Sequence, residues 1–220
     1  MQHGLLWDND GVLVDTEGLF YEANRSLFAE HGIELSPTLF FDWFLLQNLG
    51  AWHLLEARGM TAENISLLRD ERNRRYSTLL QSHSDIEIPE VKALLTSLQD
   101  KAKMGIVTSS RADHFHLIHS QLNLLEHFEF VVTEEDYPNS KPAPDPYLLG
   151  LSKLAIPREH CLVIEDSPRG LRSAISAGLL CVVIRNQLSR HFAFNGAYRV
   201  VDDYIDLGSV IEEFLDSSKA

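Results

Sequence analysis

The segment Gly4-Leu-Leu-Trp-Asp-Asn-Asp-Gly11 joins a short apolar run to two aspartates one residue apart. The run predicts a buried strand, Gly4–Trp7, that ends at Asp8 and Asp10, and open α/β sheets bind ligands at this carboxyl edge. Residues i and i+2 of an extended segment point to the same side, so both acids can reach one ligand. Two carboxylates this close need a cation or a shared proton. A carboxylate pair at a sheet edge can supply a nucleophile, a proton carrier and a ligand for Mg²⁺.

From residue 89 onward the sequence alternates between helical and strand patterns. We expect further strands at Met104–Thr108, Phe128–Val132, Cys161–Glu165 and Leu179–Ile184, and helices that begin at Pro89, near Asp113, near Pro146 and after Ser167. The helix near Asp113 is expected to run to Leu122. Strands separated by helices of this length indicate βαβ units. The chain is therefore expected to adopt an α/β fold with a Rossmann-like parallel sheet as its core.

Residues 16–83 differ from the rest, because they contain no convincing strand. Helix start signals stand at Thr16, at Ser36-Pro37 and at Thr61, and apolar residues follow at helical spacing. This block of three or four helices interrupts the sheet pattern. We expect an inserted α-helical cap domain at 16–83 and a core domain formed by 1–15 and 84–220. The cap's own core is expected to contain its aromatic residues, Phe40, Phe41, Trp43, Phe44 and Trp52.

Composition restricts the partners and the compartment. The net charge of −13 over 220 residues argues against nucleic acid and anionic membranes as partners. The sequence has no signal-peptide pattern and no apolar run near the ~18 residues that span a bilayer. Cys161 and Cys181 fall in apolar runs and are expected to be buried thiols rather than a disulfide. We expect a cytoplasmic monomer.

Polar residues follow several of the expected strands. Thr108-Ser109-Ser110 offers hydroxyls and backbone N–H groups before a helix, which suits a phosphate. Lys141-Pro142 stands in the loop after the third strand, and Glu165-Asp166 ends the fourth. Ser167 is expected to cap the next helix and Gly170 to allow close packing. Parallel strands end at one edge, so the acids, the hydroxyls and the lysine should converge there.

This ordered set resembles the haloacid dehalogenase-like hydrolase superfamily, and most closely its phosphatase and phosphomutase branch with a helical cap after the first strand. The resemblance implies that Asp8 is the nucleophile and forms a phosphoaspartate. It also implies that Asp10 protonates the leaving oxygen and then activates water. Thr108 and Lys141 are implied to be catalytic as well: Thr108 would hydrogen-bond a phosphoryl oxygen, and Lys141 would neutralise charge on the phosphoryl group and orient Asp8. Substrate binding is implied for Thr108, Ser109 and Lys141, and coordination of Mg²⁺ for Asp8, Asp10 (through its backbone carbonyl), Glu165 and Asp166.

Named residues separate the activities within this superfamily. A dehalogenase does not need the second acid, Asp10, and a phosphonatase needs a cap lysine, yet residues 1–91 contain no lysine. A phosphatase acting on a small phosphorylated metabolite, such as a sugar phosphate, is therefore favoured. A β-phosphoglucomutase-like activity stays open, because cationic cap residues remain: Arg58, Arg69, Arg72, Arg74 and Arg75. A non-catalytic binding protein on the same scaffold is the remaining alternative.

The sequence contains one histidine cluster, His114, His116 and His119. No further ligand is paired with these residues in the sequence, so a metal site is not expected there. We expect these histidines to lie on a solvated helix surface.

Overall fold

The computed structural model describes residues 2–120 and 122–217. It contains two compact units, one formed by Met1–Asp15 with Glu87–Ala220 and the other by Thr16–Ile86. The second unit is an insertion in the first, and it ends at Ile86, whereas the sequence patterns placed its end at residue 83. Residues 218–220 of the expected core range lie outside the described residues.

The first unit is built on a parallel sheet of six strands in the order β3-β2-β1-β4-β5-β6. The strands are β1 (His3–Trp7), β2 (Ala102–Val107), β3 (Phe130–Val132), β4 (Cys161–Glu165), β5 (Leu180–Ile184) and β6 (Arg199–Val201). In the central register, Leu6 of β1 pairs with Gly105 of β2 and with Val163 of β4. The predicted Rossmann-like α/β fold is confirmed. Because the strand order reverses beside β1, the carboxyl end of β1 is the topological switch point.

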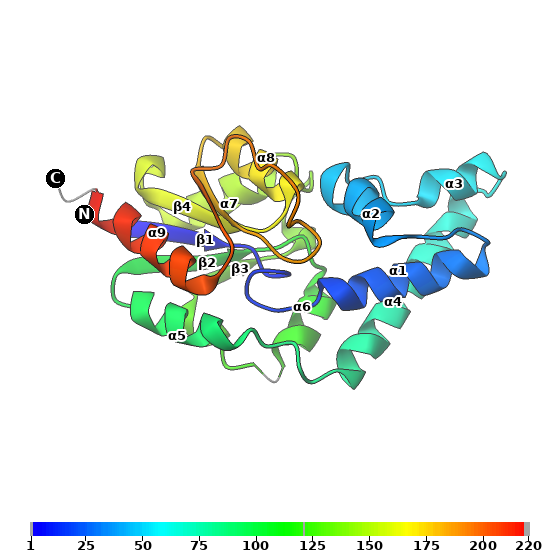
Figure 1. Cartoon of the computed structure of the whole chain (residues 1–220), viewed down its shortest axis with the longest axis horizontal. Coiled ribbons are helices and arrows are strands. Elements are labelled where there is room, and N and C mark those ends of the chain that lie inside the picture. Colours follow the sequence, from blue (N-terminus) through cyan, green and yellow to red (C-terminus); the bar gives the residue numbers. More distant parts are fainter. Residues whose placement is uncertain (1, 121, 218–220) are drawn as a thin grey trace. The chain divides into compact units, whose positions relative to one another are not determined.

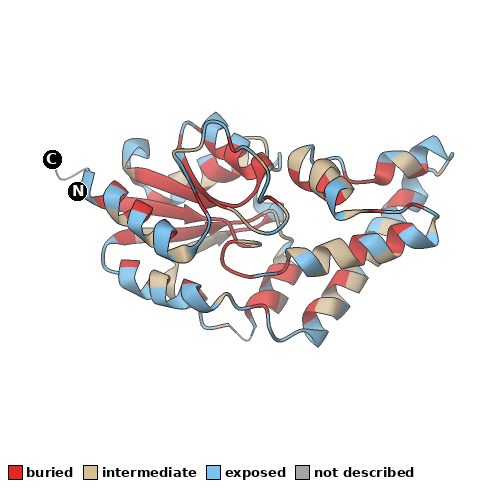
Figure 2. Cartoon of the chain, viewed as in Figure 1, coloured by how far each residue is buried: buried red, intermediate tan, exposed pale blue. Residues whose placement is uncertain are grey.

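Helices cover both faces of this sheet, as Figure 1 shows. α7 (Asp145–Leu154) and α8 (Pro168–Ser176) pack together on one face, and α5 (Pro89–Leu98) contacts α9 (Tyr204–Ser217) on the other. The central strands are therefore buried throughout (Figure 2), which explains why they read as continuous apolar runs. α6 (Ala112–His119) ends earlier than the expected Leu122, and Gln121 of that expected range lies outside the described residues.

Two elements near the end of the chain were not predicted, β6 and α9. β6 has three residues, two of them exposed, so it carries almost no apolar pattern. α9 does carry a signal, because its buried residues recur at helical spacing: Leu207, Val210, Ile211, Phe214 and Leu215. The helix could therefore have been recognised from the sequence.

The second unit is helical, as predicted. It contains α1 (Glu17–Glu30), α2 (Pro37–Phe40), a π-helical turn (Phe41–Leu46), α3 (Trp52–Ala57) and α4 (Ala62–Ser82). Two predicted start signals act as caps, because the side chains of Ser36 and Thr61 accept backbone N–H groups of the following turn. Of the aromatic residues expected in its core, Phe40, Phe44 and Trp52 are buried, whereas Phe41 and Trp43 remain partly exposed.

Both cysteines are buried free thiols, as expected. Within the described ranges, no helix combines the length and the apolar character that crossing a membrane requires.

Candidate active site

The loop that follows β1 holds the two aspartates and is stabilised by backbone hydrogen bonds within the loop. The backbone N–H of Asp8 donates to the carbonyl of Ile164 at 2.9 Å and so continues the β1–β4 ladder. The carbonyl of Asn9 then accepts the N–H groups of residues 12, 13 and 14. Gly11 has a φ of +79°, and a Cβ there would lie 2.1 Å from Oδ2 of Asp166. Glycine is therefore required by its conformation and by the close approach of Asp166.

Lys141 is the buried cation of this site and is 1 % exposed. Its Nζ lies 3.0 Å from Oδ1 of Asp8 and 2.8 Å from Oε1 of Glu165. The same ammonium group donates to the carbonyl of Val107 at 2.9 Å and to the hydroxyl of Tyr147 at 3.1 Å. The ammonium group is thus surrounded by four acceptors, and its contact with Asp8 orients that carboxylate.

Glu165 is fully buried, and both of its oxygens accept hydrogen bonds. Oε1 accepts from Lys141 and from the hydroxyl of Tyr147 at 2.7 Å. Oε2 accepts the backbone N–H groups of Asp166 and Ser167 and the hydroxyl of Ser167. A Cβ on Gly170 would lie 1.8 Å from Oε1, so Gly170 does allow close packing. These contacts make Glu165 an anchor for Lys141, and a metal ion would have to share its oxygens with donors already present.

Three carboxylates gather beside Lys141. Oxygens of Asp8, Glu165 and Asp166 lie within 4.8 Å of one another, and this is the one such acidic group among residues 2–120 and 122–217. Oδ2 of Asp166 accepts a hydrogen bond from the side-chain amide of Asn186 at 2.8 Å, which orients Asp166. An all-oxygen donor set of this kind fits Mg²⁺. The side chain of Asp10 is not part of the group.

Asp10 instead contacts the hydroxyl residues that follow β2. Its Oδ2 accepts from the hydroxyl of Ser110 at 2.6 Å and from that of Thr108 at 3.4 Å. Thr108 is fully buried, and its hydroxyl also accepts the N–H of Ser110 at 3.0 Å. The hydroxyl of Ser109 is buried. The loops after β1 and β2 therefore meet, as the sequence patterns predicted.

Burial and mutual charge perturb the acidity of these groups. Burial, together with the charge of Glu165, raises the pKa of Asp8 to about 7, although Lys141 opposes the shift. Burial alone would lower the pKa of Lys141, but the charges of Asp8 and Glu165 outweigh it and raise that pKa. Burial would likewise raise the pKa of Glu165, and the charge and hydrogen bond of Lys141 lower it. The cluster thus carries more negative charge than Lys141 balances.

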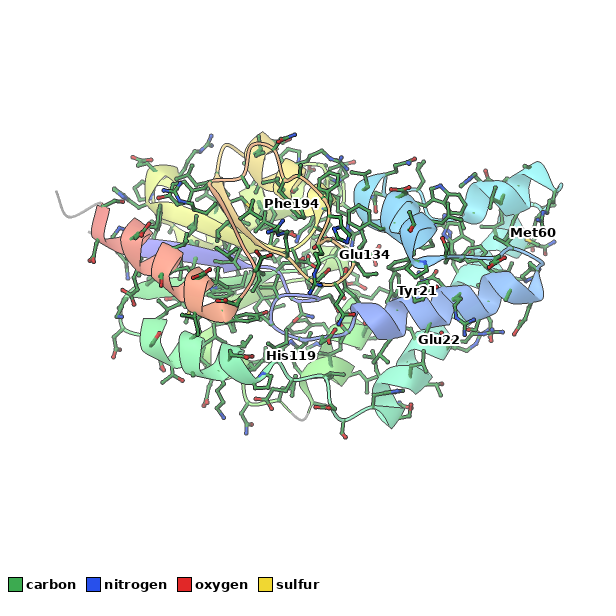
Figure 3. All side chains as sticks on the ribbon, in the orientation of Figure 1. Tyr21, Glu22, Met60, His119, Glu134 and Phe194 are labelled. Atoms are coloured by element: carbon green, nitrogen blue, oxygen red, sulfur yellow. The ribbon has the colours of Figure 1, made fainter. Side chains whose placement is uncertain are left out.

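The expectation for the histidines was wrong for two of the three. His114 and His119 are each only 5 % exposed, because α6 turns these positions inward together with Phe115 and Ile118; His116 alone is exposed. His119, labelled in Figure 3, reaches the loop after β1, where its Nε2 lies 2.7 Å from Oδ1 of Asn9.

The structure also adds site residues that sequence reasoning missed. Ser110 belongs to a hydroxyl run that was recognised, but its contact with Asp10 was not foreseen. Asn186 follows β5, so its position at the same sheet edge was predictable in principle. Tyr147 and His119 lie within helices, and the sequence carries no local signal for their contacts.

Comparisons with known proteins agree with this geometry. The family model described as haloacid dehalogenase-like hydrolase matches residues 5–184. A phosphorylated carbohydrates phosphatase of Thermotoga maritima is 31 % identical over 180 residues, which is 80 % of this chain and 81 % of the relative.

Two solved structures share the fold across nearly the whole chain. CbbY from Rhodobacter sphaeroides, crystallised in complex with phosphate, superposes with a TM-score of 0.79 at 25 % identity, covering 94 % of this chain and 97 % of CbbY. β-Phosphoglucomutase from Clostridium difficile has a TM-score of 0.83 at 22 % identity, with 99 % of each chain covered, and its likeness concerns the fold alone. The family model spans well over half of the sequence. The chain therefore belongs to the haloacid dehalogenase-like hydrolase family.

Proposed function

We propose that this protein is a Mg²⁺-dependent phosphatase that hydrolyses a small phosphorylated metabolite through a phosphoaspartate. The observation that carries the proposal is the position of Asp8. It ends the central strand, contacts the buried Lys141 at 3.0 Å and shares an acidic cluster with Asp166. A nucleophile, a fixed cation and an oxygen site for a dication are thus available to one phosphoryl group.

The metal would be held by Asp8, Asp166 and the backbone carbonyl of Asp10, with Glu165 as a further contact. When bound, Mg²⁺ supplies positive charge that lowers the pKa of Asp8 and offsets the charge of the transferring phosphoryl group. This fits the structure, since the donors are oxygens and burial raises the pKa of Asp8 to about 7.

The chain's own residues account for the covalent steps. A carboxylate oxygen of Asp8 forms a bond to phosphorus while the bond to the leaving oxygen breaks, and Asp10 gives its proton to that oxygen. Water then attacks the phosphoaspartate, Asp10 takes a proton from this water, and inorganic phosphate departs. Lys141 offsets charge on the phosphoryl group throughout, and Thr108 and Ser109 bind its oxygens.

Contacts within the helical unit favour the phosphatase over the phosphomutase. A mutase needs cationic cap residues for a second phosphate, but this unit has no lysine, and each of its six arginines already contacts a partner inside the unit. Arg25, Arg74 and Arg75 pair with glutamates, Arg58 donates to backbone carbonyls, and Arg69 and Arg72 lie over the rings of Trp52 and Phe20. The Thermotoga relative, named for phosphorylated carbohydrates, supports a sugar phosphate as substrate.

The proposal is tested by phosphate release from 4-nitrophenyl phosphate and from a panel of sugar phosphates, with Mg²⁺ and with EDTA. We expect activity that needs the metal and is lost in Asp8→Asn, while the exposed control Asp100→Asn keeps it. Activity that survives Asp8→Asn or EDTA would refute the mechanism. Isomerised sugar phosphate without net phosphate release would identify the mutase instead. Size-exclusion chromatography tests the expected monomer.

A further inference from the structure

Asn9, the residue between the two aspartates, is fully buried. Its side chain reaches α6, where the amide oxygen lies 2.7 Å from Nε2 of His119. The loop also wraps around Asn9, whose carbonyl accepts the N–H groups of residues 12, 13 and 14. The Asn9 side chain is thus held inside the molecule, one residue away from the proposed nucleophile and from the proposed acid.

The Asn9 amide links His119 to Asp10. Its Oδ1 lies 2.7 Å from Nε2 of His119, and its Nδ2 lies 3.3 Å from Oδ2 of Asp10. A carbonyl oxygen only accepts, so Nε2 of His119 must carry the proton. The reversed amide would place its oxygen against the Asp10 carboxylate. With Asp10 ionised and the amide in this orientation, His119 donates to Asn9 and Asn9 donates to Asp10.

Burial of the His119 ring carries a free-energy cost. Its other nitrogen, Nδ1, is buried and has no hydrogen-bond partner among residues 2–120 and 122–217. An unsatisfied buried acceptor costs roughly 1–3 kcal/mol, which an apolar side chain of similar shape would avoid. The His119 ring packs on Phe115, with ring centroids 4.4 Å apart. A phenylalanine at position 119 could make the same packing contact. The donor on Nε2 is what phenylalanine would lack.

We infer that His119, acting through Asn9, is a positioning residue for the Asp10 carboxyl group during proton transfer. Oδ2 of Asp10 receives donors from two directions, from Ser110 and Thr108 in the loop after β2 and from Asn9 in its own loop. Because Asn9 lies in the same loop as Asp8, its hydrogen bond fixes the position of the Asp10 carboxyl group relative to Asp8. Without His119 the Asn9 amide can rotate, and this hydrogen bond is lost. The inference rests on the proposed function, since it gives Asp10 the role of acid.

The test compares two substrates that differ in their need for an acid. An alkyl phosphate has a poor leaving group that must be protonated, whereas 4-nitrophenyl phosphate releases a stable anion without a proton. General acid catalysis contributes typically 10²–10⁴-fold, and misplacing the acid should forfeit roughly one factor of ten. In His119→Phe we expect kcat/KM to fall roughly 10-fold for the alkyl phosphate and less than about 2-fold for 4-nitrophenyl phosphate. kcat/KM reports the steps up to departure of the leaving group.

Three further variants make the result specific. His119→Gln carries an amide donor in place of Nε2–H and should restore most of the loss. Asn9→Ala removes the same link, should show the same substrate dependence, and serves if His119→Phe does not fold. His116→Phe, on the exposed side of the same helix, should leave both substrates unaffected.

Equal losses on both substrates, no loss on either, or a folded His119→Gln that restores nothing would each overturn the inference while the proposed function stands. A wild-type protein that turns over neither substrate would refute the proposed function, and the inference would fall with it.

Discussion

The substitution Lys141→Met removes a buried ammonium group from between two buried carboxylates. Its Nζ lies 2.8 Å from Glu165 and 3.0 Å from Asp8, and the lysine is 1 % exposed. Removing one partner of a buried ion pair typically costs 3–5 kcal/mol, because the remaining charge keeps its desolvation penalty. We expect a loss of about that size at pH 8. The loss should shrink as the pH falls, because protonation of the stranded carboxylates relieves it.

The double variant Lys141→Met with Glu165→Gln separates the ion pair from other effects. A glutamine oxygen can still accept from Ser167, and its amide can donate to the hydroxyl of Tyr147, so the buried group remains satisfied. We therefore expect the double variant to be more stable than the sum of the single losses predicts, by about 2 kcal/mol or more.

Urea unfolding at pH 8 and pH 6 measures these free energies, with fluorescence and circular dichroism recorded together. The fluorescence and circular dichroism transitions must coincide for these free energies to be valid, because a protein with two units need not unfold in one transition. Lys92→Met, at an exposed position of α5, is the control and should change stability by less than about 0.5 kcal/mol. A loss below about 1 kcal/mol for Lys141→Met, or strictly additive single losses, would refute the buried ion pair.

Three further perturbations test other parts of the site. Gly170→Ala should lower stability by about 1–3 kcal/mol in a thermal melt, because its Cβ would lie 1.8 Å from Glu165. Gly18→Ala, at an open position, is the control. An unchanged melting temperature for Gly170→Ala would contradict the close packing of Gly170 against Glu165. Burial lowers the pKa of His119 from 6.5 to about 4, so the unfolded chain takes up the proton first. As the pH is lowered from about 6.5 to 4, the unfolding free energy should therefore fall by up to about 1.4 kcal/mol per pH unit. Over this pH range the urea midpoint should fall less in His119→Gln than in the wild-type protein. An equal fall in the two proteins would refute this prediction. Mg²⁺ at 100 times its Kd should add about 2.7 kcal/mol of stability, and Asp166→Asn should lose that gain. A melting temperature that does not change when Mg²⁺ is added would argue against the metal site.

The sheet and the main contacts of the site were predictable because both rest on local patterns. Each central strand is buried on both faces and so reads as an apolar run, and the parallel arrangement brings the residues after each run to one edge. Asp8, Thr108 and Lys141 were placed in this way, and the structure brings them together. Their catalytic and binding roles remain proposals.

The remaining contacts depend on how helices pack, which the chain does not encode locally. Whether His119 faces solvent or the core depends on the rotation of α6 against the loop after β1, and a helix of eight residues with three histidines gives no clear apolar stripe. The sequence patterns did not single out Tyr147 of α7, yet its hydroxyl contacts both Lys141 and Glu165. Polar atoms on buried aromatic side chains are therefore where the sequence interpretation was incomplete.

The charges of the site explain how an acidic protein can receive an anionic substrate. Asp8, Glu165 and Asp166 would carry three negative charges against the single positive charge of Lys141, all within a buried cluster. Such an excess must be removed by protons or by a cation. The pKa of about 7 for Asp8 shows the first solution, but a protonated Asp8 cannot attack phosphorus. A bound dication would match the excess of two charges, would favour the ionised form of Asp8 and would help this edge to accept a phosphoryl group. Substrate binding and nucleophile activation should therefore depend on the same ion.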